Sequence, residues 1–324
     1  MAGRSEEGPW RVTGRRLRRD RFALAAGVVF LLVVAACLAA PLWAEHVAET
    51  TPERNHLTDT VVVDGERRDV VDPLGRPIGP TWNDQFFLGA DPNGRDIMVR
   101  LLYGGRNSLV IGIVAALGTI LAGLALGLLA GYHRGRVDSV IRWSMDMTWA
   151  FPVVLLAVAM GTALALQGLE VGPLRIESGS LAIPTLIIAL IYVPYLARPV
   201  RGQTLALRER EFVEAARAQG MGPTRIVFSE ILPNLASTLV VFLPLLIANA
   251  ILLEAALSFL GAGVQPPDAS WGTMIAEGLD RIVTAPHVTI APGAMLVLAV
   301  LSLNMFGEGV RDALDPRAKV RIEH

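Results

Sequence analysis

The residues best suited to specific contacts with another protein lie in a polar segment, 211–234, which separates two long apolar runs. Residues 211–219 predict a short helix, because apolar side chains recur on one face at helical spacing. That predicted face consists of Phe212, Ala215, Ala216 and Gln219, with Glu211, Glu214 and Arg217 off it. Gly220 is expected to end the helix in a left-handed conformation, and Pro223 suits the first turn of the next one. We therefore predict a helix, a tight elbow and a second helix over residues 223–232 that stops before Pro233.

Other chemistries find little support in the sequence. Lys319 is the single lysine and is followed by Val320, so no GxxxxGK[ST] phosphate loop is present and ATP hydrolysis would require another polypeptide. The one cysteine, Cys37, excludes a disulfide framework or a CxxC metal site within the chain. The apolar runs contain no paired Ser/His, Asp/Asp or HExxH arrangement. We predict neither an enzyme nor a cofactor or metal site, and the net charge of −1 gives no reason to expect nucleic acid.

Composition places the chain in a membrane. The 324 residues are 52% hydrophobic, and the mean hydropathy is +0.48, which is too apolar for a soluble domain of this length. The expected fold is all-α and integral to the membrane, with six transmembrane helices, since each apolar run is long enough to cross a bilayer. The predicted spans are residues 22–43, 108–132, 143–166, 181–200, 235–260 and 288–305.

The polar segments between the spans predict the topology. Residues 1–21 are rich in arginine and precede an apolar run longer than the ~7–15 residues of a signal-peptide core, so residues 22–43 are expected to remain as a first span. Basic residues are also concentrated in the short turn 133–142, in the elbow region 201–234 and in the tail 310–324. The positive-inside rule then predicts that both termini are cytoplasmic.

Residues 44–106 are expected to form an extracytoplasmic insert. The insert contains a hairpin signal at Asp64-Gly65 between β-branched residues. Near its end, Asp96 is predicted to cap a short amphipathic helix that runs to Tyr103 along the membrane surface. Residues 107–309 would then form a five-helix core.

Glycines and prolines predict how the spans pack. Gly123, Gly127 and Gly131 form a stripe of small residues in the second span, which allows close helix contact. Pro152 predicts a kink in the third span. The fourth span holds Pro184, Pro194 and Pro199, so a bent or broken helix is expected there.

Asn249 and Glu254 are the candidates for a translocation pathway, since both lie inside the fifth apolar run. An ionisable residue at membrane depth costs ~2.5–3.5 kcal/mol on insertion scales and therefore faces protein or water. Glu254 lies close to the outer end of its span. Two interpretations remain open for it, a pathway lining and a structural hydrogen bond.

The elbow resembles the EAA loop of ABC importer permeases, which docks into a groove of the ATPase subunit. The resemblance rests on Glu214-Ala215-Ala216, then Gly220, then Ile231-Leu232-Pro233-Asn234. The first part alone would also suit an ordinary amphipathic linker, but the ILPN at the right distance favours the docking loop. Three further stretches resemble the C-type permease subunits of dipeptide, oligopeptide and nickel importers: LGADPNGRD…RLLYGGRNSL, LSFLGAGVQPPDASWGTMI and GEGVRDALDPR.

This resemblance implies a type I importer permease with a MetI-like fold in the bacterial plasma membrane. It implies a B-type permease partner, two ATPases that bind ATP and Mg²⁺, and an extracytoplasmic binding protein. Glu214, Ala215, Ala216, Gly220, Ile231, Leu232 and Pro233 would couple this chain to the ATPase. The chain departs from the family pattern in the insert at about 48–82 and at Glu230, where a histidine is common.

A secondary transporter or channel that is not driven by ATP is the alternative. Such a protein should carry coupling charges or unwound helices in mid-membrane repeats, yet Glu254 is the one deep charge and no internal repeat is found. The spans do not distinguish dipeptides, longer peptides and nickel chelates. By resemblance, the binding protein would choose among them.

Overall fold

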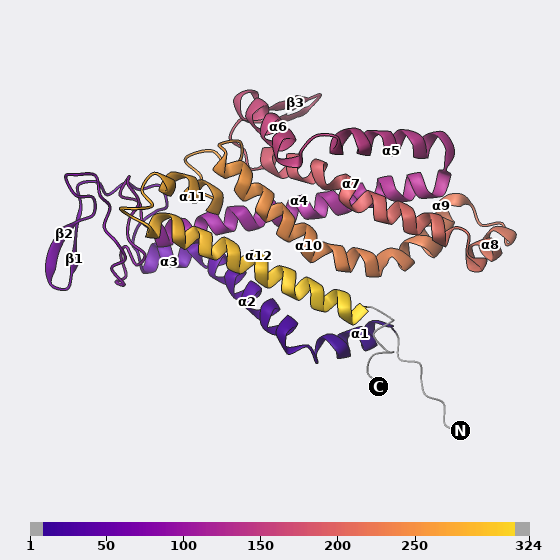
Figure 1. The fold of residues 1–324 in the computed structure, drawn as a ribbon, viewed down its shortest axis with the longest axis horizontal. Helices are drawn as coiled ribbons and strands as arrows, with labels where there is room; N and C mark the ends of the chain where they lie inside the picture. The colour runs from indigo at the N-terminus through magenta and orange to yellow at the C-terminus, as the bar shows by residue number, and fades with distance from the viewer. Residues whose placement is uncertain (1–8, 315–324) are drawn as a thin grey trace, which may run out of the picture.

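The computed structural model describes residues 9–314, and these residues form a helical bundle with its helices along one long axis (Figure 1). Five helices are long and apolar enough to cross a membrane, and one bent pair supplies a sixth candidate. The five are α2 (Arg21–Leu38), α4 (Ile97–His133), α7 (Ala182–Leu207), a continuous helix Pro223–Phe259 that contains α10 (Leu232–Phe259), and α12 (His287–Leu314). The bent pair is α5 (Gly135–Trp149) and α6 (Val153–Gln167). The predicted all-α membrane fold is confirmed.

Shorter elements occupy the two ends of the bundle. They are α1 (Pro9–Leu17), α3 (Ala40–His46), α8 (Glu211–Ala218), α9 (Pro223–Ile226), the π-helical turn η1 (Val227–Ile231), α11 (Trp271–Leu279), and the strands β1 (Thr60–Val63), β2 (Glu66–Asp69), β3 (Leu169–Val171) and β4 (Leu174–Ile176). Residues 1–8 and 315–324 lie outside the described part, and with them much of the predicted C-terminal tail and Lys319.

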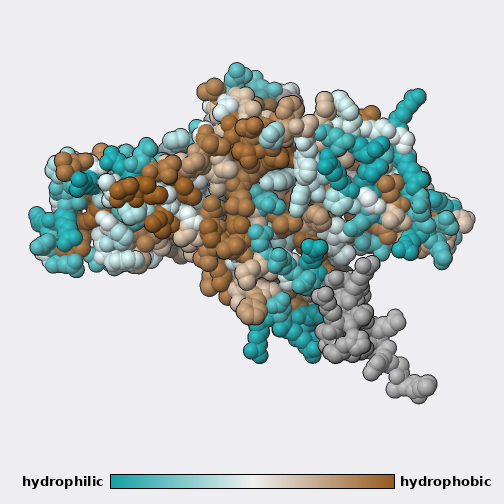
Figure 2. All heavy atoms as spheres, viewed as in Figure 1, coloured by the Kyte–Doolittle hydropathy of each residue, from teal (hydrophilic) through white to brown (hydrophobic). Residues whose placement is uncertain are grey.

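The surface of the bundle has the distribution expected of a protein in lipid. An apolar belt crosses the middle of the molecule, while the two ends are hydrophilic (Figure 2). Large apolar side chains point outward from several of the helices, among them Leu31, Leu121, Leu155, Leu190 and Leu301. Such a contiguous apolar surface would be unstable in water and matches a bilayer.

The prediction of a separate short helix that runs to Tyr103 along the membrane surface is wrong. Asp96 does cap a helix, since its carboxylate accepts the backbone N–H of Val99 at 3.0 Å, but that helix is α4 itself and continues without interruption for 37 residues. At ~1.5 Å per residue, α4 is about 55 Å long and exceeds a ~30 Å bilayer core. Its first turns therefore pack with the insert. Desolvation there raises the pKa of the Asp96 carboxyl.

Prolines behave differently in the third and fourth spans. The third span is not merely kinked near Pro152: α5 and α6 meet at 86°, because Pro152 takes an extended conformation with ψ of 125°. The fourth span, in contrast, remains one helix, α7, with Pro194 and Pro199 inside it. Tight packing against α4 accompanies this continuity. Of the two expected outcomes, a bent or a broken helix, the break is excluded.

The glycine stripe of α4 explains how closely α7 approaches. A Cβ on Gly127 would lie 2.6 Å from Cγ1 of Val200 and 2.8 Å from the carbonyl oxygen of Ala197. A Cβ on Gly131 would lie 2.6 Å from Cβ of Thr204. The predicted stripe is confirmed as a helix-packing surface.

Gly127→Val is expected to lower the stability of the protein, because α7 would have to move away from α4. Overpacking of this kind costs about 1–3 kcal/mol. Thermal unfolding of the detergent-purified protein measures the loss. Gly202→Val is the matched control, since nothing lies within 4 Å of a Cβ on Gly202. An equal unfolding temperature for the two variants would contradict the packing role.

The insert has a small core of its own. Strands β1 and β2 form an antiparallel hairpin in which Val63 pairs with Glu66. Asp64 and Gly65 both have positive φ, at 54° and 84°, which a two-residue hairpin turn requires. The predicted hairpin is confirmed, and Val61, Val70 and Phe86 are buried beneath it.

Candidate functional site: the elbow between α7 and α10

Gly220 closes helix α8 with a complete C-terminal cap. Its φ is +80°, its N–H bonds to the carbonyl of Arg217 at 2.9 Å, and the N–H of Met221 bonds to the carbonyl of Ala216 at 3.1 Å. This pair of bonds is the Schellman motif, which needs a left-handed residue at the position of Gly220. Gly222 then precedes Pro223, the first residue of α9. The predicted turn geometry is confirmed.

The buried face of α8 differs from the predicted one. Val213 and Ala216 are buried in a cluster with Ile226, Ile231 and Leu235, whereas Phe212 is exposed. Ala215 and Gln219, also assigned to the apolar face, are exposed as well. The cluster that receives α8 comes from α9, η1 and α10, which helical periodicity within α8 cannot reveal. The exposed face therefore offers Phe212, Glu214 and Ala215 to a partner.

The second elbow helix does not stop before Pro233. It continues through η1 into α10, where the N–H of Leu232 bonds to the carbonyl of Val227 across a wider turn. A π-helical turn has i→i+5 bonds, and this change of register accommodates a proline that lacks an N–H. The side-chain amide of Asn234 donates to the carbonyl of Glu230 at 2.6 Å. The predicted helix end at this position is wrong, and the elbow is part of a 37-residue helix.

The remaining predicted coupling residues divide by burial. Ile231 is buried, Leu232 is half-buried and Pro233 is exposed. Ile231 lies in the same cluster as Ala216, so both stabilise the elbow from inside. The positions that remain available to a partner are thus Glu214, Ala215 and Pro233, with Gly220 shaping the turn between them.

Two side chains that the sequence analysis did not single out anchor the entry to the elbow. Arg208, the residue that ends α7, donates to the backbone carbonyl of Tyr132 near the end of α4. Glu209 accepts from Arg134. Because these residues are far apart in sequence, no local pattern reveals the pairing. The contacts fasten the start of the elbow to the main bundle.

A bidentate ion pair holds α5 to α7 beside the elbow. Arg201 donates to the two carboxylate oxygens of Asp138 at 2.5 and 2.7 Å. Further along the same helices, Arg198 donates to Asp146 at 2.8 Å and lies over the ring of Trp149. The bidentate geometry is specific to arginine and carboxylate. It explains how the amphipathic helix α5 is held against the bundle.

Glu254 lies far from the elbow, in the half of α10 that ends at Phe259, and is fully buried. Its carboxylate accepts from Ser108 at 2.7 Å and from Ser258 at 2.6 Å. The Ser258 oxygen in turn accepts the N–H of Val264 at 3.0 Å. Two interpretations were open for Glu254, a pathway lining and a structural hydrogen bond, and these bonds favour the structural one. Asn249 is half-buried, and its backbone carbonyl accepts from Tyr192 at 3.4 Å.

Two of the sequence signatures meet at the end of the bundle opposite the elbow. Arg100 of α4 is 1% exposed and donates to Glu277 of α11 at 2.8 Å. Arg95 pairs with Glu277 and, at 2.6 Å, with Asp91. The carboxylate of Asp91 also accepts backbone N–H groups within its own loop, and the described residues contain no group of three potential metal ligands. These stretches therefore connect the insert to α4 and α11.

The amino-acid sequence of this chain, including the elbow, matches a known family. Residues 123–320 match the model of the binding-protein-dependent transport system inner membrane component, and residues 8–58 match the N-terminal transmembrane domain of oligopeptide transport permease C. The glutathione transport system permease protein GsiD of Pectobacterium atrosepticum is 38% identical over 96% of this chain and 92% of its own length. The dipeptide transport system permease protein DppC of Alkalihalophilus pseudofirmus is 36% identical over 96% of this chain and 91% of its own.

The solved structures show the same fold. An inward-facing MetNI methionine ABC transporter chain superimposes with a TM-score of 0.53 at 21% identity, and the match covers 68% of this chain and 98% of that chain. At this identity the likeness concerns the fold alone. Together with the family models and the near full-length relatives, it shows that this chain belongs to the binding-protein-dependent transport system inner membrane components, as a multi-pass permease subunit of the C type.

Proposed function

We propose that this chain forms half of the translocation pathway of an ATP-driven peptide importer. The two relatives described above are named for glutathione and dipeptide transport, which supports short peptides as the solute class. The chain would work beside a B-type permease subunit, with an extracytoplasmic binding protein that delivers the solute. Two separate ATPase subunits would bind ATP and Mg²⁺. Both termini of the chain would lie in the cytoplasm.

The elbow carries this proposal. It projects at one end of the bundle (Figure 1), opposite the insert, and exposes Phe212, Glu214 and Ala215 while its inner face is packed. The elbow is stiff, since Gly220 closes a hydrogen-bonded cap and α9 continues into α10. A displacement applied to α8 would therefore move the long helix that crosses the bundle.

Such coupling requires differential binding. A ligand shifts an equilibrium between two conformations only by the difference in its affinity for them. ATP-bound and nucleotide-free ATPases would hold the elbow in different positions, and the rigid connection through η1 would convert that difference into a movement of α10. A flexible elbow would absorb the same displacement without moving the span.

Reconstitution of the complex in proteoliposomes tests the function. Uptake of a labelled dipeptide such as alanyl-alanine is expected to require ATP, the ATPase subunits and the binding protein. Uptake by the permease subunits alone, without ATPase, would contradict the proposal and favour the secondary transporter. Liposomes with a catalytically inactive ATPase are the matched control.

Ala215→Trp is expected to weaken ATPase binding, because a large side chain would stand on the exposed face of α8 where close approach is needed. A misfit in a tightly packed interface costs about 1–3 kcal/mol, or about 5- to 150-fold in affinity. Co-purification of the ATPase with the permease measures it. Ser178→Trp, an exposed position in the loop after β4, is the control. Full retention of the ATPase by Ala215→Trp would contradict docking on this face.

A further inference from the structure

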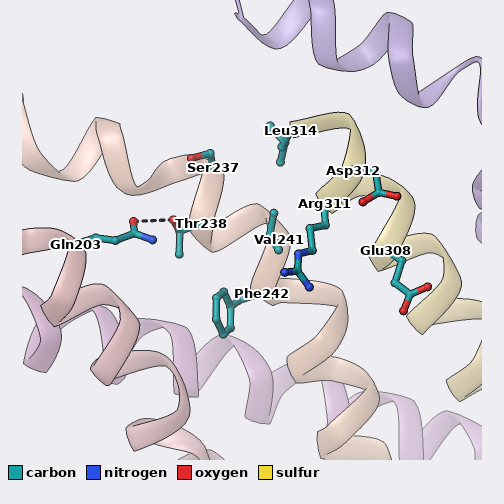
Figure 3. Close-up of a pocket in the computed structure, with 9 residues that line it drawn as sticks. All are labelled: Gln203, Ser237, Thr238, Val241, Phe242, Glu308, Arg311, Asp312 and Leu314. Carbon is teal, nitrogen blue, oxygen red and sulfur yellow. Dashed lines mark hydrogen bonds between the residues drawn. The ribbon is translucent and has the colours of Figure 1, made fainter. Parts of the chain in front are cut away.

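A polar cavity lies between α7, α10 and α12 (Figure 3). Gln203, near the end of α7, and Thr238, near the start of α10, place it in the half of the bundle nearer the elbow. It has a volume of about 520 Å³, and its lining includes Gln203, Thr238, Phe242, Glu308, Arg311 and Asp312. A second cavity of about 530 Å³ shares Phe242, Glu308 and Arg311 with the first and adds Tyr195 and Asn304. Because they share these residues, the two cavities adjoin each other and together make up the polar space between α7, α10 and α12.

The lining excludes a lipid-filled groove. Charged and amide side chains on membrane helices face protein or water, since their exposure to hydrocarbon is costly. Here α12 contributes Asn304, Glu308, Arg311 and Asp312 to one side of the space, while Gln203 of α7 and Thr238 of α10 meet across another side at 2.7 Å. The space is therefore suited to water and a polar solute.

Arg311 is poised to bind an anion. Its guanidinium reaches from α12 toward Val241 and Phe242 of α10 (Figure 3), and no residue in the described part of the chain forms an ion pair with it. A guanidinium fork matches a carboxylate in a bidentate geometry. Glu308 and Asp312 supply carboxylates on the same wall. Opposite charges are thus available within one cavity.

One lining residue of the second cavity has a buried, unused hydrogen-bond acceptor. The side-chain oxygen of Asn304 is buried and has no hydrogen-bond partner among the described residues. Leaving such an atom unpaired is costly, so a buried water molecule is expected to satisfy it. The rings of Tyr195 and Phe242 contact edge to face at 5.8 Å and form an aromatic wall nearby.

We propose that this cavity is the elbow-side section of the passage and that it binds a short peptide by both charged ends. Arg311 takes the terminal carboxylate, and Glu308 or Asp312 takes the terminal ammonium. This proposal rests on the proposed function, because it assumes a peptide as the solute. It moves the pathway assignment from Glu254, which is fully bonded, to α12.

Cysteine labelling tests the passage directly. Cys37 is the one cysteine of the chain and is 0% exposed. In a Cys37→Ala background, Asn304→Cys is therefore the one thiol of this chain, and the mass of the chain shows whether it has been labelled. A membrane-impermeant methanethiosulfonate is added to inside-out vesicles that contain the assembled complex. Asn304→Cys is expected to react quickly. Met305→Cys is the matched control, since the adjacent side chain is exposed on the apolar exterior and should react slowly.

Peptide protection then tests the binding chemistry. Alanyl-alanine, added from the elbow side at ten times its dissociation constant, should slow the labelling of Asn304→Cys about tenfold. N-acetyl-alanyl-alanine amide, which has neither charge, should not protect. Arg311→Gln should weaken the affinity for the peptide about ten- to a hundredfold, the usual effect of losing a hydrogen bond to a charged group, so that the same peptide concentration slows the labelling by only about twofold or less. Arg311→Lys should restore part of it.

The outcomes separate the two proposals. Asn304→Cys that does not react would show that a partner subunit fills the cavity, and equal protection by the two peptides would exclude recognition of the charged ends. Either result, in a complex that still imports alanyl-alanine with ATP, overturns this inference alone. Charge-dependent protection in a complex without ATP-driven uptake supports the binding site and contradicts the proposed function.

Discussion

Gly220→Val is expected to abolish peptide uptake while ATP hydrolysis by the assembled complex continues. Valine at φ of +80° places a β-branched side chain in the left-handed region, which costs about 1–3 kcal/mol. The two hydrogen bonds of the α8 cap depend on that conformation, so the elbow would relax into another turn. Uptake and ATP hydrolysis in proteoliposomes measure the loss of coupling, which we expect to reach at least tenfold, since ~1.4 kcal/mol corresponds to a factor of ten.

Gly222→Val is the matched control for this substitution. Gly222 lies two residues further along and has φ of −70° and ψ of 158°, and a Cβ on this residue would meet no atom within 4 Å. This extended conformation before a proline suits valine. The control should therefore import at nearly the normal rate. Normal uptake by Gly220→Val would refute the role of the elbow. The amount of each variant in the membrane is measured as well, so that a variant that is not expressed is excluded from the comparison.

Trp271→Ala is expected to cause the largest loss of stability. Trp271 is 0% exposed, and its indole N–H donates to the carbonyl of Leu101 at 3.1 Å. It packs against Gly105 and Cys37, where a Cβ on Gly105 would lie 2.7 Å from the indole ring. The substitution would remove a large side chain at the junction of α2, α4 and α11, together with its hydrogen bond to the Leu101 carbonyl. Truncations of this type cost about 3–5 kcal/mol.

Thermal unfolding of the purified complex checks this expectation. Trp143→Ala is the control, because Trp143 is 64% exposed on α5 and its loss should change stability by no more than about 0.5 kcal/mol. Trp271→Phe keeps an aromatic ring without the N–H and should fall between the two. Equal unfolding temperatures for Trp271→Ala and Trp143→Ala would contradict the central position of this indole.

Hydropathy predicted the position of the spans well because an apolar run acts locally. The observed helices extend past the predicted span boundaries where a helix continues beyond the bilayer, as α4 and α12 do. Hydropathy indicates which residues lie in lipid, but it does not indicate where the backbone hydrogen bonds of a helix end. Turn chemistry was equally local. Gly220 and the Asp64-Gly65 pair took the positive φ values that their positions required. The glycine stripe of α4 was likewise visible, because small residues at fixed spacing leave one surface flat.

Prolines and polar side chains in the spans could not be interpreted in this way. Pro152 precedes the first residue of a helix, Pro194 lies within one, and Pro233 follows a π-helical turn. The same residue type thus has three outcomes, and neighbouring helices and the local backbone register decide among them. Glu254 was equally ambiguous, because its hydrogen-bond partner Ser108 lies 146 residues away on another helix.

By itself, the sequence determined that this protein is a membrane helix bundle with a glycine-closed elbow, since hydrophobic length and backbone conformation are properties of short segments. Only the tertiary structure decided which face of α8 is buried, that the elbow continues into α10, and that polar groups of α7, α10 and α12 line one cavity. The reason is physical. Burial, ion pairing and cavity formation depend on contacts between segments that are distant in the chain, and a local sequence pattern does not indicate which segments come into contact.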